Sequence, residues 1–189
     1  MASKEEARLT EDLDGLIDEL QRETDRGMAL LGAAFLDECL KNLLRAYFVD
    51  DHAAQKKLFD PFGPLGTFDA RISTAYLLGL LSKTERTDFE TLKKIRNEFA
   101  HNLHGVSFAS EPIVRWIGDL RLARALVTIF DDVGDAPRDR VVTSVLLLWY
   151  AIQKATAGQQ HLTPKGEEAF AEVLIQKVRQ SKVGPKTRE

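Results

Sequence analysis

The chain has 189 residues, a length that corresponds to one domain with short tails. Hydrophobic residues make up 44% of it and charged residues 29%, which excludes a largely disordered protein. Lys and Arg number 26 against 29 Asp and Glu, and this net charge of −3 argues against a broad basic face for nucleic acid. The single cysteine, Cys39, excludes an internal disulfide or a cysteine-based zinc cluster and fits a reducing compartment.

The chain shows no signal for export or for membrane insertion. Its first residues, Met1–Glu6, are polar, so a secretory signal peptide is not expected. The longest apolar run, Val145–Ile152, is far too short to cross a bilayer. We therefore expect a soluble, cytoplasmic protein with no membrane partner.

The amino-terminal third has the apolar spacing of two helices. Leucines and an isoleucine recur at helical intervals over residues 9–20. Asp25 is expected to cap the second helix, whose stripe runs along Met28, Leu31, Phe35, Cys39, Leu43 and Tyr47 and is widened by Leu36, Leu40 and Leu44. So wide a stripe is typical of a core helix, which predicts that the Cys39 thiol is buried and not a nucleophile.

Good helix caps and a rigid loop organise residues 50–101. Asp50 and Asp51 precede a short helix over 52–59. The segment 60–66 holds two prolines and two glycines, which predicts a loop of fixed geometry. Thr67 is the expected cap of a helix that reaches Leu80, and Ser82 with Glu85 has capping-box spacing before a helix that runs to His101.

The remainder of the chain also follows helical periodicity. Pro112 begins a helix that we expect to continue to Phe130, and a second helix is expected from Pro137 to Thr156, ended by Gly158. Thr163 and Pro164 mark the start of a last helix. No convincing strand is present, so we predict an all-α fold, a helical bundle of about seven or eight helices. Residues 1–180 would form a single all-helical domain, and 181–189 a basic, disordered tail.

Three segments in sequence order carry a specific resemblance: Gly32–Leu44, Pro61–Leu81 and Leu92–His101. Over residues 25–155 the chain resembles the bacterial mannitol repressor family. The motif residues that carry this resemblance most clearly are Gly63, Pro64, Leu65, Gly66, Arg71 and Tyr76. The resemblance implies an all-helical transcriptional regulator that represses a mannitol operon without a recognised DNA-binding motif.

The residues themselves agree that no helix-turn-helix is present. The best candidate for a reading helix is the segment 88–101, which carries Lys93, Lys94 and Arg96. Its apolar residues Phe89 and Phe99 are better explained by a place in the core. We therefore expect the chain to act through a protein partner and to reach DNA indirectly.

The element Arg96-Asn97 followed by His101 also resembles the HEPN superfamily of small helical bundles, many of which are metal-independent ribonucleases. That resemblance implies that His101 acts as general base or acid toward a ribose 2′-hydroxyl, while Arg96 holds the scissile phosphate. Asn97 and His101 are four residues apart and share one face of a helix. The alternative function is thus a ribonuclease or toxin with RNA as its partner.

A structural role for this polar cluster is the competing interpretation. A histidine at a helix end complements the helix dipole, and Asn97 can bond to the backbone of the following loop. We favour this role over catalysis and do not expect an enzyme.

No cofactor and no metal site is predicted, because the four histidines lack metal-ligand spacing. Asp69 and Arg71 are expected to form a local ion pair. The small residues 32–34 and the apolar run Val145–Ile152 leave room for a homodimer face.

Overall fold

The computed structural model describes residues 15–102, 104–129, 134–158 and 161–163. Residues 15–22 are helical and precede seven further helices. These are α2 (Asp25–Tyr47), α3 (His52–Leu58), α4 (Phe68–Leu77), α5 (Lys83–His101), α6 (Ile113–Gly118), α7 (Arg121–Ile129) and α8 (Pro137–Ala157). The described residues contain no strand, which confirms the all-α prediction. Within them, no helix has the length and apolar character needed to span a membrane.

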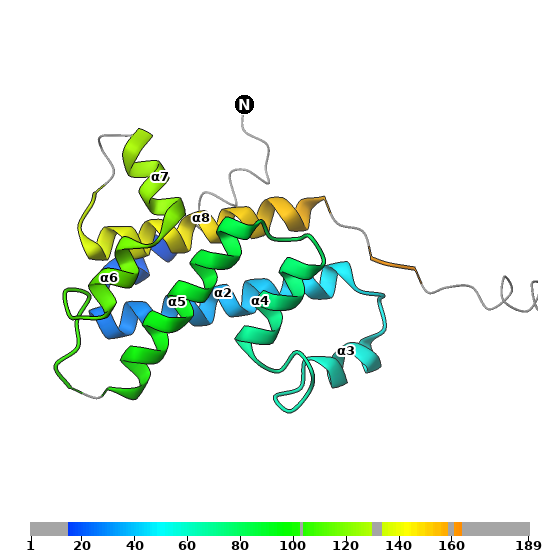
Figure 1. Cartoon of the computed structure of the whole chain (residues 1–189). Helices are drawn as coiled ribbons and strands as arrows, with labels where there is room; N and C mark the ends of the chain where they lie inside the picture. Colours follow the sequence, from blue (N-terminus) through cyan, green and yellow to red (C-terminus); the bar gives the residue numbers. More distant parts are fainter. Residues whose placement is uncertain (1–14, 103, 130–133, 159–160, 164–189) are drawn as a thin grey trace, which may run out of the picture.

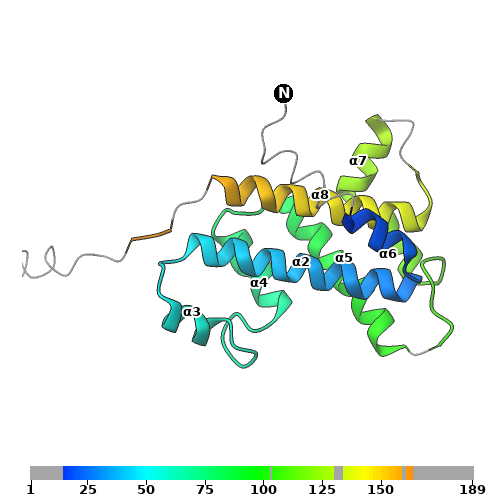
Figure 2. The same cartoon turned by 180° about the vertical axis from the view of Figure 1, so that it is seen from behind.

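Helix α2 is the central element of the bundle. It runs beside α8 in the same direction, and α4 and α5 pack together on its other side (Figure 1). The view from behind shows the helical residues 15–22 near the amino-terminal half of α8 (Figure 2). Helix α3 and the loop after it lie at one end of the molecule, and α7 lies at the other (Figure 1).

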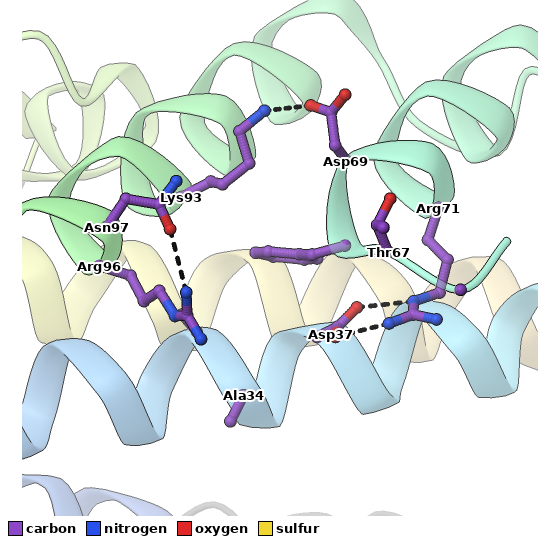
Figure 3. A pocket seen from close by; sticks show the side chains of 11 residues that line it. Ala34, Asp37, Thr67, Asp69, Arg71, Lys93, Arg96 and Asn97 are labelled. Carbon is purple, nitrogen blue, oxygen red and sulfur yellow. Dashed lines mark hydrogen bonds and ion pairs between the residues drawn. The ribbon is translucent and has the colours of Figure 1, made fainter. Parts of the chain in front are cut away.

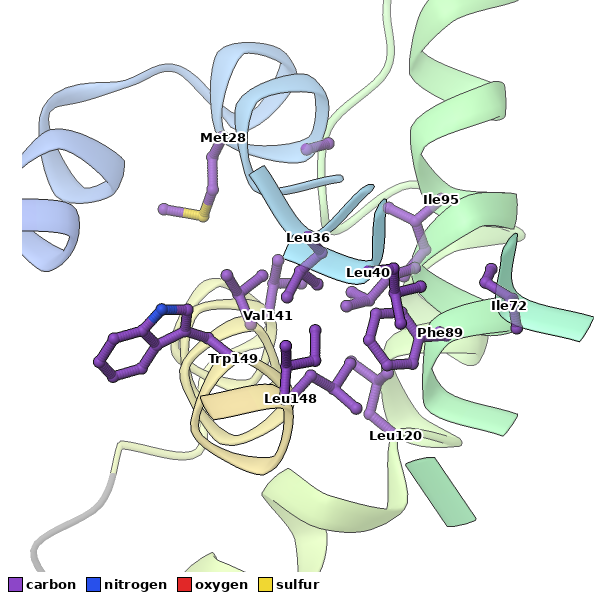
Figure 4. Packing of buried hydrophobic residues seen from close by; sticks show 14 of the residues in the cluster. Met28, Leu36, Leu40, Ile72, Phe89, Ile95, Leu120, Val141, Leu148 and Trp149 are labelled. Atoms are coloured by element: carbon purple, nitrogen blue, oxygen red, sulfur yellow. The ribbon is translucent and has the colours of Figure 1, made fainter. Parts of the chain in front are cut away.

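The core lies where α2, α5 and α8 meet (Figure 4). Leu36 and Leu40 from α2, Phe89 from α5 and Leu148 from α8 are all completely buried. The centre of the buried face of α2 therefore differs from the predicted stripe. Phe35 and Cys39 are only half-buried at the edge of this face. The reason is that α5 and α8 pack on either side of Leu36 and Leu40, which form its centre.

The small residues of α2 allow α8 to approach closely, as the sequence predicts. A Cβ atom at Gly32 would lie 3.1 Å from Cγ2 of Val145. Val145, Leu148 and Ile152 are buried in the core of the same chain. Most of the residues that suggested a homodimer face are thus covered within one molecule, although Ala34 and Tyr150 are exposed. The homodimer stays a prediction.

The start of α2 differs from its prediction. Thr24, not Asp25, is the cap, and its side chain accepts a hydrogen bond from the Gly27 amide at 3.0 Å. The Asp25 carboxylate instead accepts from Nη1 of Arg138 at 2.8 Å and from the Phe108 amide at 2.9 Å. It therefore ties α2 to α8 and to the loop after α5.

The other predicted caps are confirmed. Asp51 accepts from the Ala54 amide and Thr67 from the Ala70 amide, and Ser82 with Glu85 forms the complete capping box. Gly158 ends α8 as predicted. Residues 9–14, the predicted helix after Pro164 and the 181–189 tail lie outside the described residues.

Two predicted helices are shorter in the structure. Helix α4 ends at Leu77, and Gly79 at φ +74° turns the chain, so Leu80 lies beyond the helix. The predicted helix from Pro112 to Phe130 is split into α6 and α7. The cause is distant in sequence: the carboxylate of Asp88 accepts from the amides of Arg121 at 3.0 Å and Leu122 at 2.8 Å, and so caps α7.

Asp88 provides this cap from a fully buried position in α5. Burial raises the pKa of its carboxyl group, and the two backbone N–H groups partly oppose that shift. The amino end of α7 is therefore held by a buried acid from another helix.

Candidate functional site

The loop 60–66 folds tightly against the end of α3. A Cβ atom at Gly63 would lie 2.3 Å from the carbonyl oxygen of Lys57, and one at Gly66 would lie 2.5 Å from that of Asp60. The Leu65 amide also donates to the Leu58 carbonyl at 2.9 Å. Only glycine fits such close backbone approaches, so the two motif glycines define the shape of this loop.

Arg71 of α4 fastens the loop to α2. Its Nε and Nη2 atoms donate to the two carboxylate oxygens of Asp37, both at 2.7 Å, and Nη1 donates to the Leu65 carbonyl at 2.6 Å. The Arg71 residue is 7% exposed. A planar, bidentate guanidinium–carboxylate pair with little access to water fixes geometry strongly.

The predicted ion pair between Asp69 and Arg71 is wrong. Side chains two residues apart on a helix point about 200° away from each other, so they cannot meet. Arg71 points to Asp37 on α2, whereas Asp69 pairs with Lys93 of α5. The consequence is that α4 is linked to two neighbouring helices by two separate ion pairs.

The remaining motif residues have different surroundings. Leu65 is buried, Pro64 is exposed, and the Tyr76 ring receives the Arg86 guanidinium at 4.7 Å from its centroid. This cation–π contact joins α4 to α5. Most of the motif thus builds and anchors the loop and α4.

A pocket of about 380 Å³ lies between α2, the first turn of α4 and α5 (Figure 3). Polar side chains line most of it. The lining residues with side-chain charge or an amide are Asp37, Asp69, Arg71, Lys93, Arg96 and Asn97. Phe68 forms an apolar wall, and its ring packs edge-on against Phe89 at 6.1 Å between centroids.

The structure brings together two of the three residues predicted for a ribonuclease. Arg96 and Asn97 both line the pocket, and Nη1 of Arg96 donates to Oδ1 of Asn97 at 3.1 Å. His101 is exposed at the end of α5 and does not line the pocket. Asn97 bonds to Arg96 and not, as predicted, to the backbone of the following loop. Another residue bonds to the backbone at the end of α5.

That residue is Arg26 of α2, which sequence reasoning missed. Its guanidinium donates to the carbonyl oxygens of Phe99 and Asn102 at the end of α5. A cation at this point also complements the carboxyl end of the helix dipole. The contact joins residues more than seventy positions apart, and no local pattern indicates it.

Cys39 lies in a different place from the one predicted. It is half-buried and lines a groove of about 570 Å³ with Leu16, Phe35 and Trp149. Burial, with a smaller effect of Glu38, raises the pKa of the thiol to about 11. The thiol therefore stays protonated at neutral pH.

The described residues contain no group of three His, Cys, Asp or Glu side chains placed to hold a metal ion. Of the paired acids in the sequence, Asp51 is a helix cap, while Asp131 and Asp132 lie outside the described residues. The candidate site consists of the loop 60–66, which Arg71 anchors, and the charged pocket between α2, α4 and α5.

Comparison with protein families supplies the identity that geometry alone does not. The family model described as mannitol repressor matches residues 12–178. The chain belongs to the mannitol repressor family. Mannitol operon repressors of Escherichia coli K12 and of E. coli O6:H1 are each 31% identical to it over 107 residues. The match covers 54% of this chain and 55% of each relative, so the chain spans about half the length of the curated relatives it matches.

Two solved structures share the fold of this family member. The MtlR–HPr complex from E. coli matches with a TM-score of 0.61 at 24% identity, over 74% of this chain and 97% of the other. A possible transcriptional regulator, YggD from Shigella flexneri 2a, matches with a TM-score of 0.60 at 16% identity, over 76% and 98%. The family model and the two curated repressors confirm the predicted family, the solved structures share its fold, and none of them supports the ribonuclease alternative.

Proposed function

We propose that this member of the mannitol repressor family represses transcription through a protein partner and not through a DNA-reading helix of its own. The observation that carries the proposal is Phe62, whose side chain is 99% exposed at the tip of the anchored loop 60–66. A fully exposed aromatic side chain on a loop of fixed shape can act as an anchor that a partner protein covers.

The loop has the properties of a preformed binding element. Gly63 allows its backbone to lie against the end of α3, Gly66 allows the loop to close on Asp60, and Arg71 bonds to its Leu65 carbonyl. Rigid aromatic anchors contribute strongly to binding because little conformational entropy is lost when a partner covers them. Exposed Lys56 and Lys57 in the last turn of α3 and the exposed Asp60, whose carboxylate accepts from the Phe62 amide, give the surface around Phe62 charges of both signs.

Helix α5, the only basic helix considered for DNA reading, has its apolar face in the core. Phe89, Ile95 and Phe99 are buried there, and Lys93 is paired with Asp69. A recognition helix must present one full face to the major groove. This packing supports indirect action on DNA.

HPr is the partner we propose, in the form made by the same organism. The supporting observation is the likeness to the E. coli protein whose structure is described as the MtlR–HPr complex. The mannitol operon remains the proposed target, from the likeness to the two curated repressors.

Calorimetric titration of the full chain with that HPr tests the proposal. We expect saturable binding that Phe62→Ala weakens tenfold or more, since removing an aromatic anchor commonly costs about 2 kcal/mol or more. Leu77→Ala is the matched control, because Leu77 is also highly exposed, at 81%, but lies at the far end of α4. Absence of HPr binding, or equal affinity of the Phe62→Ala variant, would contradict the proposal.

A gel-shift experiment at low salt on the DNA upstream of the chain's own gene tests whether the chain binds DNA directly. Basic contacts to phosphate are strongest at low salt, so this condition favours direct binding. We expect no shift by the chain alone. A sequence-specific shift by the purified chain would show direct DNA reading.

A further inference from the structure

We propose that the pocket between α2, α4 and α5 binds a small phosphate-type oxyanion, either inorganic phosphate or the phosphate group of a small ester. This inference does not depend on the partner proposed above. It rests on the hydrogen bonds of two arginines that line this cavity. Every guanidinium nitrogen of Arg71 has a partner, whereas Arg96 has donors without one among the described residues.

Arg71 cannot be the ligand-binding group. All three of its guanidinium nitrogens are engaged, two by Asp37 and one by the Leu65 carbonyl. The Asp37 carboxylate is occupied by the same contact. This pair is therefore electrically balanced and acts as a wall of the pocket.

Arg96 is the group with free donors. Among the described residues its one side-chain hydrogen bond goes to Oδ1 of Asn97, and no described carboxylate pairs with it. A guanidinium carries five N–H donors, so most of those on Arg96 are available to a ligand. The Asn97 amide oxygen accepts this bond, and no described group accepts from the Asn97 amide nitrogen (Figure 3).

Lys93 lies one helical turn before Arg96 and on the same side of α5. Its partner Asp69 has a side chain that is 65% exposed. An exposed ion pair contributes little net stability, so Lys93 can exchange this carboxylate for an anion in the pocket. Counting Arg71, Lys93 and Arg96 against Asp37 and Asp69 leaves the pocket with one net positive charge.

The shape of the pocket also fits a small anion. Ala33 and Ala34 are short side chains on the α2 wall, and Phe68 provides an apolar surface for the carbon part of an ester. The first turn of α4 contributes Phe68 and Asp69 to the lining, and the amino end of a helix favours negative charge. Its volume of about 380 Å³ lies in the usual range for small-molecule sites, about 300–1,000 Å³.

The experiment is a titration of the full chain with inorganic phosphate at constant ionic strength, followed by backbone amide chemical shifts. Saturable shifts are expected at residues 66–69 and 93–97. We expect Arg96→Gln to weaken the apparent affinity at least tenfold, because it removes the charge and the planar fork. We expect Asp69→Asn to tighten binding several-fold, because it releases Lys93 from its carboxylate.

Arg115→Gln is the matched control, because the Arg115 side chain is 73% exposed on α6, pairs with Glu111 just before that helix and does not line the pocket. It should leave the phosphate affinity unchanged. A parallel titration with glycerol 3-phosphate, a simple phosphate ester, distinguishes the two sources of the anion. Tighter binding of the ester would assign the Phe68 wall to its carbon part, and equal binding would assign the site to phosphate alone.

Three results would overturn the proposal: no saturable shift at these residues, equal weakening by Arg96→Gln and Arg115→Gln, or weaker binding by Asp69→Asn. Because Arg96 is exposed, its replacement should leave the thermal midpoint of unfolding unchanged. Loss of binding by a folded Arg96→Gln variant can therefore be assigned to the pocket.

Discussion

The two sides of helix α2 are built by different physical means. Toward α8 the contact is apolar and close, with Gly32 against Val145, and Leu36 and Leu40 are completely buried where α2 meets α8 and α5. Toward α4 the same helix presents Asp37 to Arg71 and borders the charged pocket. The packing of side-chain volumes sets the position of α8 against α2, and directional hydrogen bonds set the position of α4.

The difference matters for function. A close-packed apolar interface resists any change in the distance between its helices. The charged side instead holds its groups at fixed angles while leaving a cavity open between them. A helix that is rigid on one side can therefore present a stable polar pocket on the other. Three substitutions test this division.

The largest effect is expected on the apolar side, from Leu40→Ala. Leu40 is 0% exposed, so the substitution removes buried methyl groups and leaves a cavity. Such changes cost about 2–5 kcal/mol, and we expect about 4 kcal/mol here, measured as the free energy of unfolding in urea. Leu77→Ala, at an 81% exposed position, should change it by less than about 0.5 kcal/mol. Similar values for both variants would show that this side is not packed as described.

The second-largest effect is expected from Arg71→Met, which should lower the free energy of unfolding by about 3 kcal/mol. The substitution leaves the Asp37 carboxylate without its partner, and breaking a partly buried pair from one side costs about 3–5 kcal/mol at most. Replacing both residues, as Arg71→Met with Asp37→Leu, should cost less than Arg71→Met alone. If the double variant is the less stable of the two, the pair does not act as a unit. Urea unfolding measures both.

The smallest effect is expected from Gly32→Ala, about 1–2 kcal/mol of destabilisation, because the new Cβ would lie 3.1 Å from Val145 and push α8 away. Gly118→Ala is the control of opposite sign. A Cβ atom there meets nothing within 4 Å, so the higher helix propensity of alanine should stabilise the chain by about 0.5–1 kcal/mol. The thermal midpoints of the two variants should shift in opposite directions, and stabilisation by Gly32→Ala would contradict the close contact.

Local signals in the sequence predict local structure well. The side chains of Asp51, Thr67 and Ser82 each cap the helix that follows, as their residue types indicate. The apolar periodicity also predicts the all-α class and the extent of α5 and α8 closely. These features depend on residues only a few positions apart, which is why a single sequence contains them.

Features that depend on distant residues are missed. The break between α6 and α7 follows from Asp88, more than thirty positions earlier, and the correct partner of Arg71 lies thirty-four positions away on α2. The sequence points to the motif around Arg71 but not to the pocket beside it. The pocket exists only because α2, α4 and α5 converge, and no spacing within one helix indicates that.

Arg138 attaches the helical residues 15–22 to the rest of the bundle. Besides Asp25, this arginine bonds to the carbonyl oxygens of Leu20 and Gln21, so one side chain of α8 holds the end of that short helix. Gly15, Leu16 and Glu19 of the same segment line the groove that contains Cys39. Detachment of this segment would take Leu16 and Leu20 out of the core and expose the Cys39 thiol further. The thiol of Cys39 is already half-exposed in this groove, and its alkylation should become faster when residues 15–22 detach.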